Sequence, residues 1–386
     1  MLQRERKNPD RSFFLFGPRQ TGKSTWLKAL ALTPGWTVNL LMNDTYFRYV
    51  RDPAQFGREA REKIKHGVSW IIVDEIQRVP DLLNEVHNLL ESSDVRFVLS
   101  GSSARKLKRS GGNMLGGRAL LRHMHPFTVR EIEQHGGENC FDLEHALVWG
   151  TLPPLHGLNN KDAADTLRAY VQVYLREEIQ LEALVRNLGG FTRFLDVTAA
   201  YCGEIVNFTS LGKEAGLPTR TVQSYFEVLE DTLIALRLPA WRKSPTKRLL
   251  SHPKMYLFDN GVTNALCHRL HSRVDPTLKG RLFEQFMVQE TNRRLDYSGR
   301  DYALYYWRTN HGAEVDLLIE LDGSLHRAIE FKSTAAIGRG DLSGLSSFHE
   351  DNPEVECFVV CLAPEPFSLD FVHVIPWRDY LAALSR

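Results

Sequence analysis

The chain has 386 residues, of which 43% are hydrophobic and 25% charged, and its formal net charge is +1. This length predicts two or three globular domains, and the near-neutral charge excludes a molecule-wide attraction to nucleic acid or anionic lipid, so such binding needs a local basic patch. Five scattered cysteines without a CxxC pair, and the lack of an apolar run of membrane-spanning length, favour a cytoplasmic protein without disulfides or membrane contact.

The first expected element is a buried strand in SFFLF, residues 12–16, followed at once by a glycine-framed loop, after which helical spacing begins in STWLKALAL. Strand, glycine loop and helix are the context in which backbone N–H groups wrap around a phosphate. Lys23 is expected to reach the β- and γ-phosphates as a catalytic residue, and the Ser24 hydroxyl to ligate Mg²⁺. The predicted nucleotide-binding residues here are Gly17, Pro18, Arg19, Gln20, Thr21, Gly22, Lys23, Ser24 and Thr25.

A second apolar strand, residues 70–73, runs directly into two acids within VSWIIVDEIQRVPDLL. We expect Asp74 to hold Mg²⁺ and contribute to the nucleotide site, and Glu75 to act as general base for the attacking water. A strand that merely ends in solvated acids is the alternative. The phosphate loop upstream favours the first interpretation, and with it hydrolysis over simple binding.

Further strands are expected in WTVNLL, VRFVLSGSS and ALLRHMHPF, with helices near residues 54–66 and 81–91. This alternation predicts a parallel sheet covered on both faces. Ser100 or Ser102 is the candidate polar sensor of the γ-phosphate, although Ser-Gly-Ser is also ordinary turn chemistry. Arg118, in GGNMLGGRAL, is a candidate catalytic finger toward a neighbouring subunit of a homo-oligomer, and a solvated loop arginine is the alternative.

The motifs GPRQTGKS, VDEIQRVPDLL, LSGSSARKL, GGRA and HPFTVREI occur in this order. They resemble a prokaryotic AAA+ ATPase family whose members carry a nuclease-like carboxy-terminal domain of unknown function, and the resemblance extends along nearly the whole chain. It implies ATP and Mg²⁺ as cofactors. One departure is the leading segment of about ten residues before the first strand, where the family has a longer one that helps to enclose the base. Adenine selectivity is therefore implied by the resemblance alone.

A Pro/Gly-rich connection, GTLPPLHGL, predicts a domain boundary near residue 150, after which a helical stretch is expected to form a lid or spacer on the ATPase. In FTSLGKEAGLPTRTVQSYFEVLEDT, a short helix, a turn through residues 216–218 and a second helix from Thr219 predict a helix-turn-helix. The region as a whole predicts a winged-helix domain that ends near residue 250.

DNA is the partner that this middle region predicts. Arg220, Gln223 and Ser224 would face outwards from the second helix. A basic hairpin at residues 242–254 is expected to grip phosphates as a wing, with the cations Arg242, Lys243, Lys247, Arg248 and Lys254. Against DNA, the second helix also carries the acids Glu227, Glu230 and Asp231. A packing module without DNA contact therefore stays open.

The last part of the chain brings four chemistry-bearing residues together. Glu284 lies in the apolar stripe of a predicted helix, which is unusual for a carboxylate unless it points into a polar site. A hairpin turn at residues 322–323 places Asp316 nearly opposite Glu330, and Lys332 leaves the same strand face. These residues resemble the PD-(D/E)XK nuclease core, which implies that Asp316 and Glu330 hold Mg²⁺ and that Lys332 orients or activates water, with Glu284 as an outer carboxylate. An exposed strand face decorated with Glu and Lys is the alternative.

The sequence thus predicts an α/β protein with a P-loop (AAA+) domain at residues 1–150, a helical and winged-helix domain at 151–250 and a restriction-endonuclease-like domain at 251–386. Two functions fit this layout. The first is an ATP-hydrolysing protein that acts on DNA, with cleavage left open. The second is a nucleotide-driven switch whose later domains bind a protein partner without nuclease activity.

Overall fold

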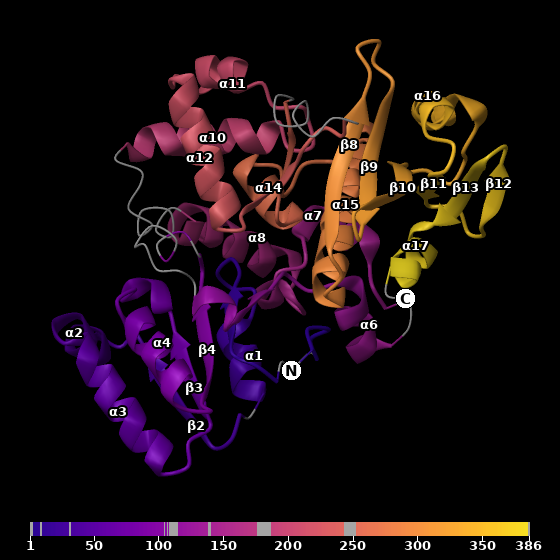
Figure 1. Cartoon of the computed structure of the whole chain (residues 1–386). Coiled ribbons are helices and arrows are strands. Elements are labelled where there is room, and N and C mark those ends of the chain that lie inside the picture. Colours follow the sequence, from indigo (N-terminus) through magenta and orange to yellow (C-terminus); the bar gives the residue numbers. More distant parts are fainter. Residues whose placement is uncertain are drawn as a thin grey trace.

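The structure is a computed structural model that describes residues 3–7, 10–30, 32–103, 105, 107, 115–137, 140–175, 187–242 and 252–384, apart from the side chain of residue 174. Figure 1 shows an amino-terminal sheet domain in indigo and purple, a helical region in rose, and a second sheet in orange and yellow. Within the described residues, every helix is too short or too polar to cross a lipid bilayer.

The amino-terminal domain is a sheet of five parallel strands in the order β2-β3-β4-β1-β5. The strands are β1 (Phe13–Phe16), β2 (Gly35–Asn39), β3 (Trp70–Asp74), β4 (Arg96–Gly101) and β5 (Leu120–His123). The helices between them are α1 (Lys23–Ala29), α2 (Asn43–Arg51), α3 (Pro53–Lys65) and α4 (Leu82–Ser92). The predicted strands and the three predicted helices, α1, α3 and α4, are confirmed, whereas α2 was not predicted.

Both faces of this sheet are buried, because successive side chains of a strand point to opposite sides. Phe14 and Phe16 of β1 join the cluster formed with α2, α3 and α4, whereas Phe13 and Leu15 join the cluster formed with α1. The predicted parallel sheet with helices on both faces is therefore confirmed. A strand run without polar alternation is the sequence signal for this arrangement.

The helical region contains α8 (Asn160–Ala169), α10 (Leu188–Ala200), α11 (Phe208–Ala215), α12 (Thr219–Asp231) and α14 (Asn260–Leu266), with the antiparallel strands β6 (Ala235–Leu238) and β7 (Lys254–Leu257). The expected turn between α11 and α12 is present. Gly216 takes a left-handed conformation at φ 65°, and a side chain at Gly212 would lie 2.7 Å from the Leu217 carbonyl oxygen. Phe194 and Phe226 then pack edge to face across α10 and α12, with ring centroids 4.9 Å apart.

The last part is a mixed sheet in the order β12-β13-β11-β10-β9-β8. Its strands are β8 (Tyr302–Arg308), β9 (Glu314–Leu321), β10 (Ser324–Phe331), β11 (Glu356–Cys361), β12 (Phe367–Leu369) and β13 (Val372–Pro376). On one face lie α15 (Pro276–Ser298) and α17 (Trp377–Leu384), and on the other α16 (Ser343–Asp351). A parallel-sheet α/β domain followed by helices and a further sheet confirms the predicted fold class.

Two short helices from the first part of the chain, α6 (Val129–Gly136) and α7 (Leu143–Trp149), pack into the cluster built on α15. Phe141, between them, stacks on Phe286 of α15 with ring centroids 5.8 Å apart. These helices thus contribute to the core of the last sheet. The domain limits at residues 150 and 250 stay predictions.

Candidate functional site

The loop between β1 and α1 has the backbone that a phosphate cradle needs. Gly22 has φ 91° and Gln20 φ 63°, both in the left-handed region. A side chain at Gly17 would lie 2.2 Å from the Met124 carbonyl oxygen, so only glycine fits there. Lys23 donates from Nζ to the carbonyl oxygens of Gly17 at 2.6 Å and of Pro18 at 3.0 Å, across the mouth of the loop.

The carboxyl ends of β1, β4 and β3 meet beside this loop because the three strands are parallel and adjacent, with Asp74 in register with Ser100. Asp74 accepts hydrogen bonds from Ser24 Oγ at 3.0 Å and from Ser100 Oγ at 2.5 Å. A hydroxyl and a carboxylate oxygen are ligands that Mg²⁺ favours. The predicted pair Ser24 and Asp74 therefore lies together in a form that fits a magnesium ion.

Glu75 follows β3 in the left-handed conformation, with φ 63° and ψ 43°. Gln77 donates from Nε2 to Glu75 Oε2 at 2.6 Å and to Ser102 Oγ at 3.2 Å, which links the predicted base to a predicted sensor. A side chain at Gly101 would lie 2.2 Å from Gln77 Oε1, so the Ser-Gly-Ser sequence makes room for this amide. Sequence reasoning missed Gln77, and the glycine between two serines is the signal that pointed to a close approach.

A cavity of about 600 Å³ opens beside the loop. Its walls are residues 3–7, Phe127, Pro153, and the loop and α1 residues Gly22, Thr25, Trp26, Ala29 and Leu30. Arg4 fixes the leading segment there, because it donates to the carbonyl oxygens of Thr21 at 2.8 Å and His125 at 2.6 Å, and pairs with Glu131 at 2.9 Å. Thus the short leading segment encloses space next to the phosphate loop, which the sequence did not predict.

Arg118 lies at the other edge of the sheet. It precedes β5, whose first residue pairs with the first residue of β1, and its guanidinium is 2.8 Å from Glu91 Oε1 at the end of α4. The phosphate loop follows the opposite ends of these strands, so Arg118 does not belong to the site of its own chain. A role toward a neighbouring copy stays a prediction.

The predicted acidic residues of the last sheet also lie together. Leu317 of β9 is paired with Ile329 of β10, which places Asp316 and Glu330 side by side. Asp316 Oδ2 accepts the Phe331 backbone N–H at 2.9 Å, and Lys332 Nζ lies 2.9 Å from Glu330 Oε1. The turn that creates this register has positive φ at both Asp322 and Gly323, 50° and 81°.

The prediction that Lys254 helps a basic hairpin to grip phosphates is wrong. It begins β7 with 3% of its surface exposed, and its Nζ lies 3.0 Å from Glu284 Oε1, 2.6 Å from Glu314 Oε1 and 3.8 Å from Asp316 Oδ1. A lysine buried among carboxylates does not reach the phosphates of a duplex. Arg242 is described, and the remaining cations of the hairpin, Lys243, Lys247 and Arg248, lie outside the described residues.

The proximity of these acids changes their proton affinities. Burial raises the pKa of Asp316 well above its usual value, and the neighbouring Glu330 and Glu284 carboxylates raise it further. Burial also raises the pKa of Glu330, although Lys332 opposes this. Tyr256 donates to Glu284 Oε1 at 2.6 Å. A crowded acid group of this kind favours a bound cation or a proton.

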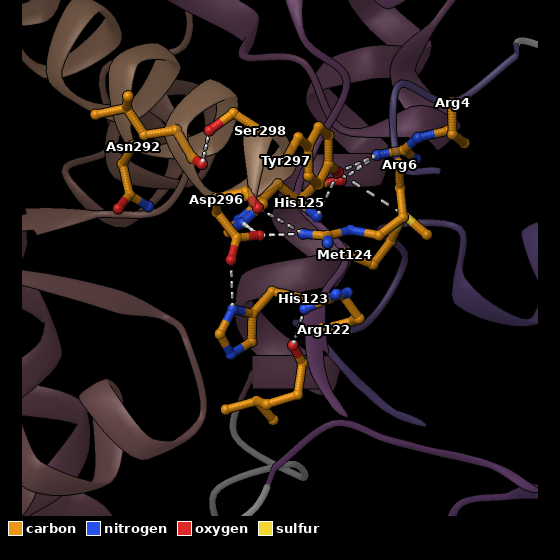
Figure 2. Close-up of polar contacts among 12 residues, drawn as sticks. Arg4, Arg6, Arg122, His123, Met124, His125, Asn292, Asp296, Tyr297 and Ser298 are labelled. Atoms are coloured by element: carbon orange, nitrogen blue, oxygen red, sulfur yellow. Dashed lines mark hydrogen bonds and ion pairs between the residues drawn. The ribbon is translucent and has the colours of Figure 1, made fainter. Parts of the chain in front are cut away.

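Sequence reasoning missed a third polar cluster, which Figure 2 shows at the contact between β5 and the end of α15. Asp296 Oδ1 lies within hydrogen-bond distance of His123 Nδ1, at 3.1 Å, and Asp296 Oδ2 of His125 Nε2, at 3.0 Å. Asp296 also forms an ion pair with Arg6. Two histidines and one carboxylate have a spacing that suits a metal ion. Because Arg6 already balances the Asp296 charge, we interpret the cluster as a set of polar contacts that connects the two sheet domains.

The amino-terminal part combines a parallel sheet, a glycine loop before α1 and two acids at the end of β3. In a comparison with protein families, residues 9–133 match the family described as AAA domain. Residues 140–274 and 279–380 match two further families, described as domains of unknown function DUF8612 and DUF4143.

Among curated sequences, the chain is 27% identical over 341 residues to the uncharacterized proteins Rv2008c of Mycobacterium tuberculosis and Mb2031c of Mycobacterium bovis, covering 86% of this chain and 73% of each relative. Among solved structures it is similar to the Aeropyrum pernix ORC1 protein in complex with DNA, at 16% identity, TM-score 0.27 and coverage of 68% of this chain and 87% of that one. A second is the replication initiator DnaA bound to AMPPCP and single-stranded DNA, at 12% identity, TM-score 0.29 and coverage of 57% and 82%. TM-scores this low carry no inference about function.

Proposed function

We propose that the chain binds ATP with Mg²⁺ and hydrolyses it. The observation that carries this proposal is Asp74, held between the hydroxyls of Ser24 and Ser100 beside the glycine loop. Lys23 would exchange its two loop carbonyl partners for phosphate oxygens, Ser24 and Asp74 would hold Mg²⁺, and Glu75 would take a proton from the attacking water. The bound ion would offset the charge of the phosphates.

The cavity beside the loop supports a nucleoside as the ligand. Its volume of about 600 Å³ is of the size of small-ligand sites, and apolar walls from Trp26, Leu30 and Phe127 suit a planar base. Thr25 and Gly22 join this space to the phosphate loop. We therefore place the base against the leading segment and α1, with Arg4 holding that wall closed.

The test is the hydrolysis rate of Glu75→Gln. We expect kcat for ATP hydrolysis to fall by about a hundredfold or more, because general-base catalysis contributes on that order, while ATP binding by calorimetry is retained. Glu62→Gln, an exposed glutamate on α3, is the matched control and should leave the rate unchanged. An unaltered rate in Glu75→Gln would show that Glu75 is not the general base. If the wild type does not bind ATP, the proposed function is wrong.

The middle region supports action on DNA. Arg220, Gln223 and Ser224 are exposed on α12, as a reader of nucleic acid requires. Of the acids on this helix, Asp231 pairs with Arg105, which follows β4, at 2.5 Å, whereas Glu227 stays exposed. The Arg105 pair offsets one of the negative charges, and we propose that a winged helix grips a duplex while ATP turns over.

For the last sheet we propose metal-dependent cleavage of DNA, with Asp316 and Glu330 at the ion, Glu284 as an outer carboxylate and Lys332 at the water. The rival function is a nucleotide-driven switch that binds a protein partner. DNA retention that falls steeply between about 50 and 200 mM salt supports the first function, and no retention at low salt supports the second. Nicking that requires Mg²⁺ and is lost in Lys332→Ala, but kept in Lys279→Ala, would separate cutting from binding alone.

A further inference from the structure

Lys254 reaches the acidic site from outside the last sheet. It brings one ammonium to three carboxylates from two elements, Glu284 of α15 and Glu314 and Asp316 of β9. Its own strand, β7, belongs to the two-stranded sheet of the helical region. The cation therefore enters the site from a different part of the fold.

The burial of Lys254 shows that this is more than a surface ion pair. Its side chain is 4% exposed, and the Glu284 and Asp316 side chains are 19% and 12% exposed. Removing an ammonium from water carries a cost of several kcal/mol, which is recovered only where oxygens surround the charge. A divalent cation is stabilised by the same kind of oxygen set.

One oxygen of the site has no hydrogen-bond partner. Glu330 Oε2 is buried and unpaired among the described residues, while its other oxygen contacts Lys332. Lys254 contacts Glu284, Glu314 and Asp316 and leaves Glu330 Oε2 without a donor. A divalent ion held by Asp316 and Glu330 would give that oxygen a partner, so the residues present fit the ion.

We propose that Lys254 is the resident cation of this site and that it competes with a divalent metal for Glu284 and Asp316. The inference rests on the proposed metal-dependent function of the last sheet. Metal enters only when Lys254 Nζ leaves these two oxygens, and Tyr256, which donates to the same Glu284 oxygen, keeps the carboxylate in place. Lys254 therefore sets which cation the site holds.

The experiment measures Mn²⁺ binding to the full nucleotide-free chain by calorimetry and by electron paramagnetic resonance. Lys254→Met keeps the length of the side chain and removes its charge. We expect it to bind Mn²⁺ at least tenfold more tightly than the wild type, and Mn²⁺ to raise its thermal midpoint more than that of the wild type. Lys279→Met, the same change at a half-exposed site of α15, is the control and should match the wild type.

The double variant Lys254→Met/Asp316→Asn must lose the gain, which assigns it to this site and not to the phosphate loop. Equal or weaker Mn²⁺ binding by Lys254→Met overturns the proposal. If Lys254→Met does not fold, Lys254→Gln, which keeps an N–H donor for Glu284, is judged by the same criterion. The binding measurement uses no DNA, so its outcome is independent of cleavage: if Lys254→Met binds Mn²⁺ more tightly but a separate nicking assay finds the DNA intact, the proposed cleavage is refuted and the role of Lys254 stands.

Discussion

At the scale of single residues, the positions of the proposed metal ligand Asp74 and the proposed base Glu75 depend on one unusual backbone conformation. Successive side chains of a strand point to opposite faces, so Asp74 and Glu75 would separate if β3 continued. The strand instead ends at Asp74, and Glu75 takes φ 63°, a conformation that costs a non-glycine residue about 1 kcal/mol or more. Gln77 then holds Glu75 at 2.6 Å. Strain at this point lets both carboxylates serve one edge of the sheet.

The two buried lysines illustrate how environment decides the role of a side chain. Lys23 donates to the neutral carbonyl oxygens of Gly17 and Pro18, and phosphate oxygens offer a charged ammonium a stronger interaction. Lys254 already has carboxylates around it. The first lysine is thus poised to receive an anion, whereas the second occupies a cation site.

At the scale of elements, the end of β4 links the nucleotide site to α12. Ser100 and Ser102 contact Asp74 and Gln77, and three residues further on Arg105 pairs with Asp231. Arg105 is 4% exposed, so its charge depends on this partner. The serines beside the phosphate loop are therefore close in sequence to the arginine that holds the helix that would face DNA.

We predict that Arg105→Gln uncouples the nucleotide from α12. In the wild type, ATP should change amide hydrogen exchange along α12, and in the variant this change should fall to less than half. ATPase activity should stay within about twofold, since the Arg105 guanidinium pairs with Asp231 of α12. Arg237→Gln, which removes a longer pair with Glu230 in the same region, is the control. An undiminished response in Arg105→Gln would show that the coupling runs elsewhere.

Local patterns explain which elements could be predicted from the sequence. The strand–loop–helix at the phosphate loop, the turn at residues 216–218 and the hairpin at Asp322 each depend on residues within a short window, and all are present. Contacts between segments that are distant in the sequence could not be predicted from it. The burial of Lys254, the cavity wall formed by residues 3–7 and the bridge at Asp296 depend on residues more than a hundred positions apart or on a partner of opposite charge that no spacing rule identifies.

At the scale of the whole molecule, the leading segment joins three parts of the fold. Arg4 contacts the phosphate loop and α6, and it also donates to Tyr297 Oη of α15 at 3.1 Å. Arg6 pairs with Asp296 of α15 and lies over the Tyr297 ring, 4.6 Å from its centroid. Figure 2 shows these side chains converging from both sheet domains. The wall of the base cavity is therefore part of the contact between the domains.

This contact predicts a pH dependence of stability. Burial lowers the pKa of His125 to about 4, against the raising effect of Asp296, while His123 and Arg293 lower it further. The unfolded chain, with a pKa near 6.5, binds a proton that the folded chain does not, so stability is lost as pH falls from about 6.5 toward 4, by about 1.4 kcal/mol per unit.

Asp296 contributes outside that window. Burial would raise its pKa, but hydrogen bonds from His123 and His125 hold the pKa below its usual value, so its contribution is lost only below about pH 4. Calorimetric thermal midpoints between pH 7 and pH 5 should therefore fall in the wild type and fall less in His125→Gln, whose amide keeps a donor for Asp296. His66→Gln, an exposed histidine of the first domain, should follow the wild type. Parallel curves for all three proteins would mean that His125 titrates normally and that the bridge between the domains does not respond to pH.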